Sequence, residues 1–254
     1  MQSLDRAAQL VKQVSSSFST ANVRSPLVLS VGSTPTAHAA GTNGQLGEAL
    51  KIKSNLTGGE LELHAGNYPA LDLQQVGTNA IPNTQIPGIE RCALSVLATI
   101  TASYPSRSTM NGDAQPPHAD GLAKQGDEAM LDGGGIAFAK DLGPIPGYGH
   151  VVWPKKYIGW QLGRVAQEHG VMTLRSGSPS DWYAEWGYDK QSLNLAIDQI
   201  KTYSPTLGEK VQIIPQHACM TAAAHPWYFI YDSSTSTSEQ VPIVMDIWVP
   251  WKGW

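Results

Sequence analysis

The chain has few cysteines, few charges and no long apolar run, and each shortage excludes a class of protein. Cys92 and Cys219 are the two cysteines among 254 residues. They are too few for a disulfide framework, so a reducing, cytoplasmic location is expected. Charged residues make up 15% of the chain, and the formal net charge of -4 comes without a basic run, which argues against a nucleic-acid partner. No stretch of about 18 apolar residues exists, so no membrane span is expected.

Glycine and proline are plentiful instead, with 25 and 17 residues. Together with the low charge, they favour strands joined by many loops over long surface helices. The first six residues lack the apolar core of a signal peptide.

The first part of the chain alternates helical and strand patterns. Residues 26–31 and 60–64 are short strand-like runs, and each follows a helical repeat, in residues 4–14 and more weakly in residues 46–50. This alternation predicts a parallel α/β layout. In such layouts, the loops at the carboxyl ends of the strands carry the ligand site.

The loops after these two strands are rich in hydrogen-bond donors. Thr34 follows the first strand, and Gly66 and Asn67 follow the second. Hydroxyl groups, an amide and tightly turning backbone suit a phosphate group. The same residue types also dominate ordinary turns, so both interpretations stay open at this point.

After about residue 85 the pattern changes to short apolar runs separated by glycine, proline, aspartate and serine. These runs predict a mostly antiparallel β-domain with one helix at residues 191–200. The predicted strands are residues 92–103, 129–139 with a glycine bulge, 147–153, 167–174, 211–214, 227–231 and 243–249.

One of these strands, residues 211–214, leads into Pro215 and then sets His217 and Cys219 two positions apart. If the strand continues, side chains at i and i+2 point to the same face. An imidazole beside a thiol is half of a site for zinc, which prefers nitrogen and sulfur donors. The alternative is that both residues are simply packed, as buried cysteines often are.

Taken in order, several segments resemble the family of D-serine dehydratases and D-threonine aldolases. These are pyridoxal-phosphate enzymes with an alanine-racemase-like barrel followed by a β-domain. Residues 215–219 (Pro-Gln-His-Ala-Cys) are similar to the family's Pro-Asn-His-x-Cys metal strand. The other matching segments are residues 30–36 (Ser-Val-Gly-Ser-Thr-Pro-Thr), 62–68 (Glu-Leu-His-Ala-Gly-Asn-Tyr), 129–141, 167–170 (Gln-Glu-His-Gly) and 246–254.

The resemblance implies a fold of class α/β plus mostly β. Residues 1–86 would be the last βα units of a TIM-like (β/α) barrel, and residues 87–254 an antiparallel β-domain. It implies a D-amino acid substrate, and the reaction would convert D-serine to pyruvate and ammonia. The alternative within the family is a D-threonine aldolase, which would yield glycine and acetaldehyde. The cysteine at position 219 favours the dehydratase, because aldolase relatives tend to carry a carboxylate there.

The resemblance also assigns residues to cofactors. Thr34, Gly66 and Asn67 would hold pyridoxal phosphate, and His217 and Cys219 would bind zinc. The roles of four further residues stay open between lining the site and packing: Glu168, His169, Tyr148 and His225. Family members pair barrel and β-domain across a dimer, which leaves a homodimer open for this chain.

The chain also departs from the family pattern. Gln216 stands at a position where the family usually has asparagine. Ala223, shortly before His225, stands at a position where the family often has asparagine. The family's Schiff-base lysine has no counterpart, so the chain would begin inside the barrel, and Met1 need not be the true start. We therefore assign no catalytic residue and expect the chain to be inactive alone. A non-catalytic zinc-binding remnant is the alternative from another class.

Overall fold

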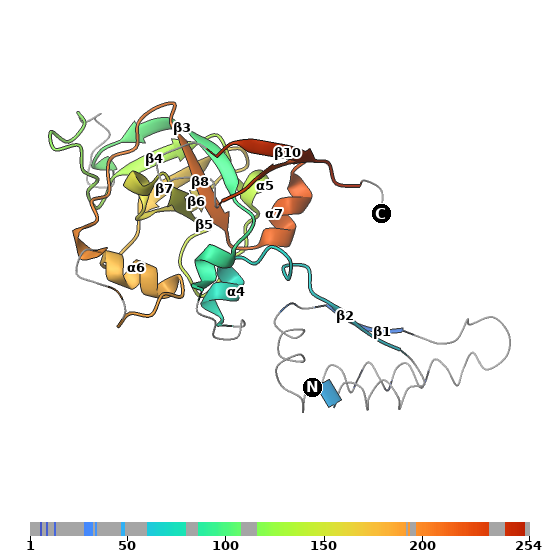
Figure 1. Cartoon of the computed structure of the whole chain (residues 1–254). Coiled ribbons are helices and arrows are strands. Elements are labelled where there is room, and N and C mark those ends of the chain that lie inside the picture. Colours follow the sequence, from blue (N-terminus) through green and yellow to red (C-terminus); the bar gives the residue numbers. More distant parts are fainter. Residues whose placement is uncertain are drawn as a thin grey trace. The chain divides into compact units, whose positions relative to one another are not determined.

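The computed structural model describes residues 28–32, 60–79, 86–107, 116–191, 197–233 and 242–251, and single residues at 6, 9, 13, 34, 47, 48 and 193 (Figure 1). Contacts within the chain divide it into two units. The first comprises residues 1–68 with 80–82, and the second comprises residues 69–79 with 83–254. The predicted domain boundary at residue 86 stays a prediction.

In the first unit, strand β1 (Val28–Gly32) pairs in parallel with strand β2 (Glu60–His64). Both strands lie where the sequence predicted them, but the predicted fold class was wrong. Within the described part of the chain there is no (β/α) barrel, and the barrel that closes is antiparallel and lies in the second unit. Two parallel strands cannot close a barrel by themselves. The helical repeats of residues 4–14 and 46–50 lie mostly outside the described residues.

The barrel of the second unit has the strand order β3-β4-β7-β6-β5-β8. All its neighbouring strands are antiparallel, and it closes because β8 pairs with both β3 and β5. Closure removes the unpaired edges that an open sheet would expose. The strands are β3 (Val96–Tyr104), β4 (Glu128–Leu131), β5 (Gly149–Trp153), β6 (Trp160–Val165), β7 (Gly170–Leu174) and β8 (Lys210–Pro215).

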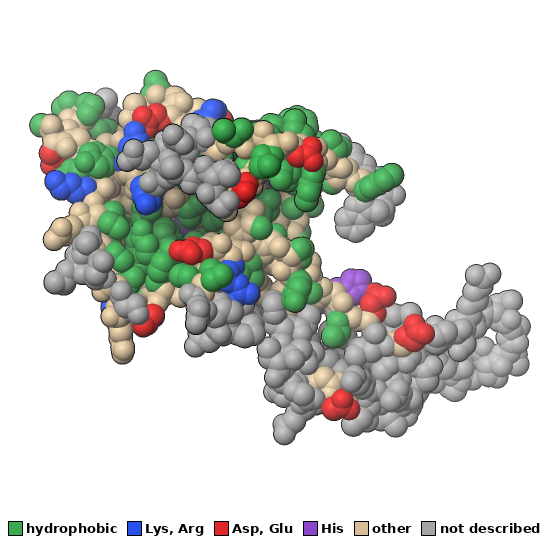
Figure 2. All heavy atoms as spheres, viewed as in Figure 1, with side chains coloured by type: hydrophobic (Ala, Val, Ile, Leu, Met, Phe, Trp, Pro, Cys, Tyr) green, Lys and Arg blue, Asp and Glu red, His purple; other side chains and the backbone are tan. Residues whose placement is uncertain are grey.

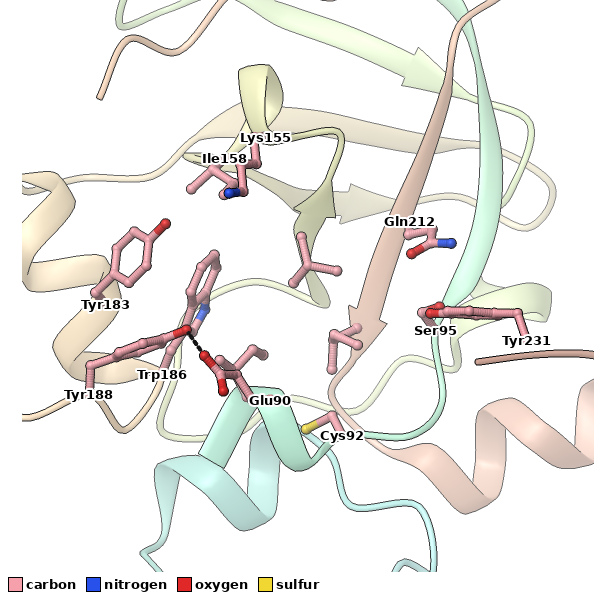
Figure 3. Close-up of a pocket in the computed structure, with 13 residues that line it drawn as sticks. Glu90, Cys92, Ser95, Lys155, Ile158, Tyr183, Trp186, Tyr188, Gln212 and Tyr231 are labelled. Carbon is pink, nitrogen blue, oxygen red and sulfur yellow. Dashed lines mark hydrogen bonds between the residues drawn. The ribbon is translucent and has the colours of Figure 1, made fainter. Parts of the chain in front are cut away.

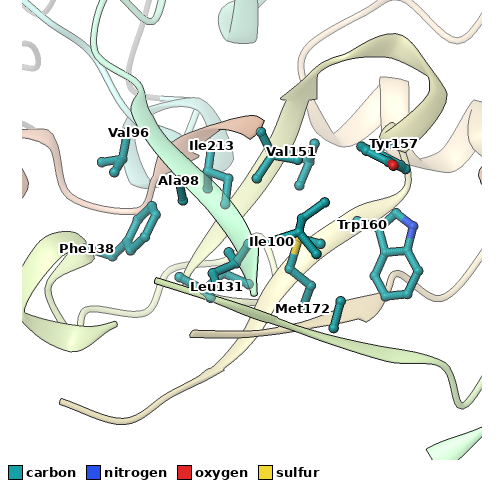
Figure 4. Packing of buried hydrophobic residues seen from close by; sticks show 13 residues of the cluster. Val96, Ala98, Ile100, Leu131, Phe138, Val151, Tyr157, Trp160, Met172 and Ile213 are labelled. Carbon is teal, nitrogen blue, oxygen red and sulfur yellow. The ribbon is translucent and has the colours of Figure 1, made fainter. Parts of the chain in front are cut away.

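Alternating side chains of these strands fill the barrel (Figure 4). Along β3, for example, Val96, Ala98 and Ile100 are buried, as the two-residue period of a strand requires. A barrel of six strands is narrow enough for side chains to fill its interior. The core cluster also contains Ala129, Leu131, Phe138, Val151, Tyr157, Trp160, Leu162, Met172, Val211 and Ile213.

A second apolar cluster attaches short helices to the outside of the barrel. It consists of Leu73, Ile89, Ile145, Ile158, Trp186 and Ile214. Leu73 begins helix α4 (Leu73–Gly77), Ile89 lies in the 3-10 helix η1 (Gly88–Arg91), and Trp186 caps helix α6 (Pro179–Glu185). Two shorter 3-10 turns are η3 (Lys155–Tyr157) and η4 (Ile197–Gln199).

Beyond the barrel, strands β9 (Tyr228–Tyr231) and β10 (Val244–Trp248) form a two-stranded antiparallel sheet. Every residue of β10 is exposed, and Figure 2 shows hydrophobic side chains gathered over this pair. Across the described part of the chain, no helix is long and apolar enough to cross a membrane.

Candidate functional site

His217 and Cys219 lie at the junction between β8 and helix α7 (Ala218–Ala224). The condition that the strand continues through them is not met, because β8 ends at Pro215 and His217 is the N-cap of the helix. The first turn of α7 nevertheless brings the two side chains together. Nε2 of His217 lies 2.8 Å from Sγ of Cys219.

The start of α7 is fixed by a buried carboxylate, Asp72, which is 0% exposed. The backbone N–H of Ala218 donates to Oδ2 of Asp72 at 2.8 Å. The other oxygen, Oδ1, accepts from the backbone N–H of Gln75 at 3.0 Å and so caps helix α4. Burial raises the pKa of the Asp72 carboxyl, while these backbone hydrogen bonds lower it. One carboxyl group therefore joins the N-termini of two helices beside the His–Cys pair.

Helix α7 is also fastened to helix α5 (Gly135–Phe138). The hydroxyl of Thr221 donates to the carbonyl of Phe138 at 3.2 Å, and Nε2 of His225 donates to the carbonyl of Ala137 at 3.0 Å. His225 therefore has a structural contact, at the C-cap of α7. These bonds hold the turn that carries His217 and Cys219 against the barrel.

Helix α5 was predicted as a strand with a glycine bulge, and this was wrong. Its first N–H groups donate to the turn between β6 and β7, from Gly135 to the carbonyl of Ala166 at 2.7 Å and from Ile136 to that of Gln167 at 3.2 Å. A Cβ atom on Gly134 would lie 2.6 Å from the backbone nitrogen of His169. The glycines therefore allow a close approach of two backbones.

A third side chain, Asp141, meets His217 from the loop after α5. Its Oδ2 atom is in contact with Nδ1 of His217. The sequence did not point to this role, or to that of Asp72, although Asp141 ends the matching segment 129–141. Both carboxylates are distant from residue 217 in sequence, and only the fold places them beside the pair.

The donors of this site fit a zinc ion in type, and their spacing is close to what zinc requires. Tetrahedral zinc with ordinary bond lengths would separate a nitrogen and a sulfur ligand by about 3.5 Å. A small side-chain movement from the observed 2.8 Å reaches that separation. In the residues that the structure describes, no group of three or more His, Cys, Asp or Glu could hold a metal ion. Two protein donors would leave positions for other ligands.

The charge state of Cys219 bears on metal binding. Burial raises the pKa of the thiol, and the nearby carboxylates of Asp72 and Asp141 raise it further. The thiolate is the form that binds metals. Metal binding at this pair would therefore release the thiol proton.

In the first unit, the structure brings together two of the three predicted phosphate ligands. The backbone N–H of Asn67 donates to Oγ1 of Thr34 at 3.2 Å, and these residues are only 4% and 6% exposed. Gly66 is exposed in the same turn. All three follow the carboxyl ends of the parallel strands β1 and β2, where hydroxyl and backbone N–H groups suit an anion. Their assignment to pyridoxal phosphate stays a prediction.

The remaining predicted positions lie elsewhere. Glu168 and His169 are exposed in the turn between β6 and β7, and Tyr148 packs against the barrel core. A cavity of about 290 Å³ on the outer wall is lined by Trp186 and three tyrosines, among other residues (Figure 3). Neither His217 nor Cys219 lines this cavity. The His–Cys pair is the candidate functional site of the second unit because it brings a nitrogen donor and a sulfur donor together.

The chain is similar in sequence to known dehydratases. A family model described as "Putative serine dehydratase domain" matches residues 93–231. The chain is 33% identical over 230 residues to the D-serine dehydratase of Schizosaccharomyces pombe, covering 90% of this chain and 41% of that protein. It is 30% identical over 225 residues to the D-threo-3-hydroxyaspartate dehydratase of a Delftia species, covering 84% and 44%. The chain thus spans less than half the length of these relatives.

Solved structures show the same likeness at the level of the fold. An alanine-racemase-like protein from Idiomarina loihiensis matches with a TM-score of 0.51 at 16% identity, over 98% of this chain and 70% of that protein. A variant of D-threo-3-hydroxyaspartate dehydratase matches with a TM-score of 0.50 at 24% identity, over 99% of this chain and 49% of that one.

Proposed function

The chain belongs to the family of serine dehydratase domains, and we propose from this that it is part of a pyridoxal-phosphate- and zinc-dependent D-serine dehydratase. The resemblance seen in the sequence motifs is thereby confirmed. The complete reaction would convert D-serine to pyruvate and ammonia. This chain would contribute the metal-binding region and part of the cofactor-binding region.

The observation that carries the proposal is the convergence of His217 and Cys219, 2.8 Å apart between Nε2 and Sγ. These two residues would hold zinc, and Thr34, Gly66 and Asn67 would hold the phosphate of pyridoxal phosphate. When bound, zinc supplies a Lewis acid for the departing β-hydroxyl, and the pyridoxal ring supplies an electron sink for the carbanion at Cα.

The chain's own residues have definable tasks in this scheme. As metal ligands, Cys219 would bind as the thiolate and His217 through the lone pair of Nε2. Asp72 keeps the first turn of α7 in place through the backbone N–H of Ala218. The small number of protein donors leaves room for a substrate oxygen, as catalytic zinc sites require.

The metal assignment is tested by measuring zinc bound to the purified chain, by elemental analysis after dialysis against a weak chelator. We expect one zinc per chain in the wild type, and loss of that zinc in His217→Ala and in Cys219→Ala. Matched controls are Cys92→Ala, which removes the other cysteine, and exposed His169→Ala. Stoichiometric zinc in both site variants would show that the metal site lies elsewhere.

The activity assignment needs a separate assay, because the chain contains no match to the family's Schiff-base lysine. We expect the chain alone, with zinc and pyridoxal phosphate added, to form no pyruvate from D-serine in a lactate-dehydrogenase-coupled assay. Pyruvate above the protein-free control would overturn this expected inactivity. If zinc binds without catalysis in a longer chain that restores the lysine, the alternative of a non-catalytic zinc-binding protein is favoured.

A further inference from the structure

Asp141 and His217 meet although they come from different parts of the barrel. Asp141 lies in the loop between α5 and β5, and His217 follows β8. Nδ1 of the imidazole contacts Oδ2 of Asp141, while Nε2 lies 2.8 Å from Sγ of Cys219. A single ring therefore joins a carboxylate on one side to a thiol on the other.

We propose that Asp141 is a positioning residue for the metal ligand His217. Its carboxylate accepts a hydrogen bond from the N–H at Nδ1 and so leaves the lone pair of Nε2 directed toward Cys219. A neutral imidazole carries one N–H, and the partner of one nitrogen decides which tautomer is present. A carboxylate behind a metal-binding histidine fixes the ring orientation and raises its basicity as a ligand. This inference rests on the proposed zinc site.

The backbone around Asp141 makes the contact a fixed feature of the fold. Ala139 has φ 63° and ψ 179°, a region that residues other than glycine rarely occupy. This turn redirects the chain between α5 and Asp141. On the other side, Thr221 and His225 tie α7 to the carbonyls of Phe138 and Ala137. The carboxylate and the imidazole are thus each held by structure fastened to α5.

Asp72 also faces this region, but it has a different task. Its two oxygens accept the backbone N–H groups of Gln75 and Ala218, so it fixes the helix start. Of the two carboxylates, Asp141 is the one in contact with the ring nitrogen. Its side chain is 41% exposed, so replacing it leaves no buried charge without a partner.

The test compares zinc affinity in Asp141→Ala and Asp141→Asn with that of the wild type, by competition with a chromophoric chelator. Loss of a carboxylate behind a metal-binding histidine weakens metal binding by about 10- to 100-fold. We expect a loss of that size for Asp141→Ala and a smaller loss for Asp141→Asn, whose amide oxygen still accepts a hydrogen bond. Asp120→Asn, an exposed aspartate that caps the N–H of Leu122, is the matched control and should bind zinc like the wild type.

A spectroscopic measurement separates positioning from general loss of structure. In the cobalt-substituted chain, the visible absorption bands report the geometry of the ligands, and they should shift in Asp141→Ala. Thermal unfolding of the metal-free variants should match that of the wild type. If Asp141→Ala keeps wild-type zinc affinity and cobalt bands while His217→Ala loses the metal, the inference fails and the zinc site stands.

If the wild type binds no zinc, the proposed metal site fails. The position of the proton on the His217 ring then tests whether Asp141 orients that ring. Long-range proton–nitrogen NMR of the metal-free chain, at a pH where the ring is neutral, identifies the protonated nitrogen of His217. We expect the proton on Nδ1 in the wild type and a mixture of tautomers in Asp141→Ala. A wild-type ring protonated on Nε2 would overturn the inference.

Discussion

The barrel and the strand pair β9–β10 are both antiparallel and apolar, but only the barrel hides its side chains from solvent. Met172 on β7 is 0% exposed, whereas Met245 on β10 is 70% exposed. The barrel encloses its inward-facing residues because β8, at one end of the strand order, pairs with β3 at the other end. A two-stranded sheet has no interior, so its apolar residues remain at the surface. The difference in burial between these two regions follows from closure of the sheet and not from apolar content alone.

The candidate site lies where these two regions meet, because α7 connects β8 of the barrel to β9. Gln216, next to His217, is 0% exposed, and its Nε2 donates to the carbonyls of Ile145 and Gly147 at 2.8 and 2.7 Å. The barrel thus fixes the backbone before the His–Cys pair. His217 and Cys219 themselves remain partly accessible, which a substrate-binding metal site requires.

The largest expected effect tests this comparison with one substitution in each region. Met172→Ala removes a fully buried side chain from the barrel and should lower the free energy of unfolding by about 2–5 kcal/mol. Met245→Ala removes an exposed side chain of the same type and should change it by about 0.5 kcal/mol or less. Urea denaturation followed by circular dichroism measures both. Equal losses in the two variants would show that β10 is buried in solution.

Much of the strand content followed from local sequence, because strands with β-branched and aromatic residues have a clear pattern. The runs at residues 92–103, 147–153 and 211–214 correspond to β3, β5 and β8. Strand β6 was missed, since Trp160–Val165 includes a glycine and an arginine that interrupt the apolar run. Helix α5 was mistaken for a strand because four residues are too few to show a helical period.

Closure and long-range contacts could not be predicted in this way. No local pattern states that β8 pairs with both β3 and β5. The pair His217 and Cys219 was identified from its donor types, but with the wrong backbone geometry, because the strand pattern of residues 211–214 was extended past Pro215. The alanines of α7 in fact favour a helix. Asp141 reaches His217 only through the turn at Ala139.

A second, smaller effect tests how strongly the barrel excludes water from a titratable group. His150 on β5 is buried; it accepts a hydrogen bond from Nε1 of Trp186 at 2.8 Å and donates to the carbonyl of Pro146 at 2.7 Å. Burial, together with the nearby charge of Arg175, lowers its pKa from 6.5 to about 3. On the strand pair, by contrast, the titratable residue Asp246 of β10 is exposed to solvent.

This pKa shift predicts a pH dependence with a definite sign. The unfolded chain takes up a proton on His150 below about pH 6.5, whereas the folded chain does so only near pH 3. His150 should therefore lower the free energy of unfolding by about 1.4 kcal/mol per pH unit as the pH falls through this window. His150→Gln, which keeps a donor and an acceptor, should show a flatter pH profile in urea denaturation. If the free energy of unfolding depended on pH as steeply in His150→Gln as in the wild type, His150 would be protonated in the folded chain.

The smallest expected effect concerns a turn outside the closed sheet, at Ala139. Its φ of 63° and ψ of 179° fall where a Cβ atom is strained by about 1–3 kcal/mol. Ala139→Gly should relieve this strain at an entropic cost below about 1 kcal/mol, for a net gain of about 1 kcal/mol. Ala137→Gly, the same change two residues earlier inside α5, should instead destabilise by about 1 kcal/mol, because glycine is a poor helix former. Urea denaturation measures the free energy of unfolding of both variants. A gain for Ala139→Gly with a loss for Ala137→Gly would place the strain in the turn before Asp141. A loss of this free energy in both variants would mean that Ala139 is unstrained in solution.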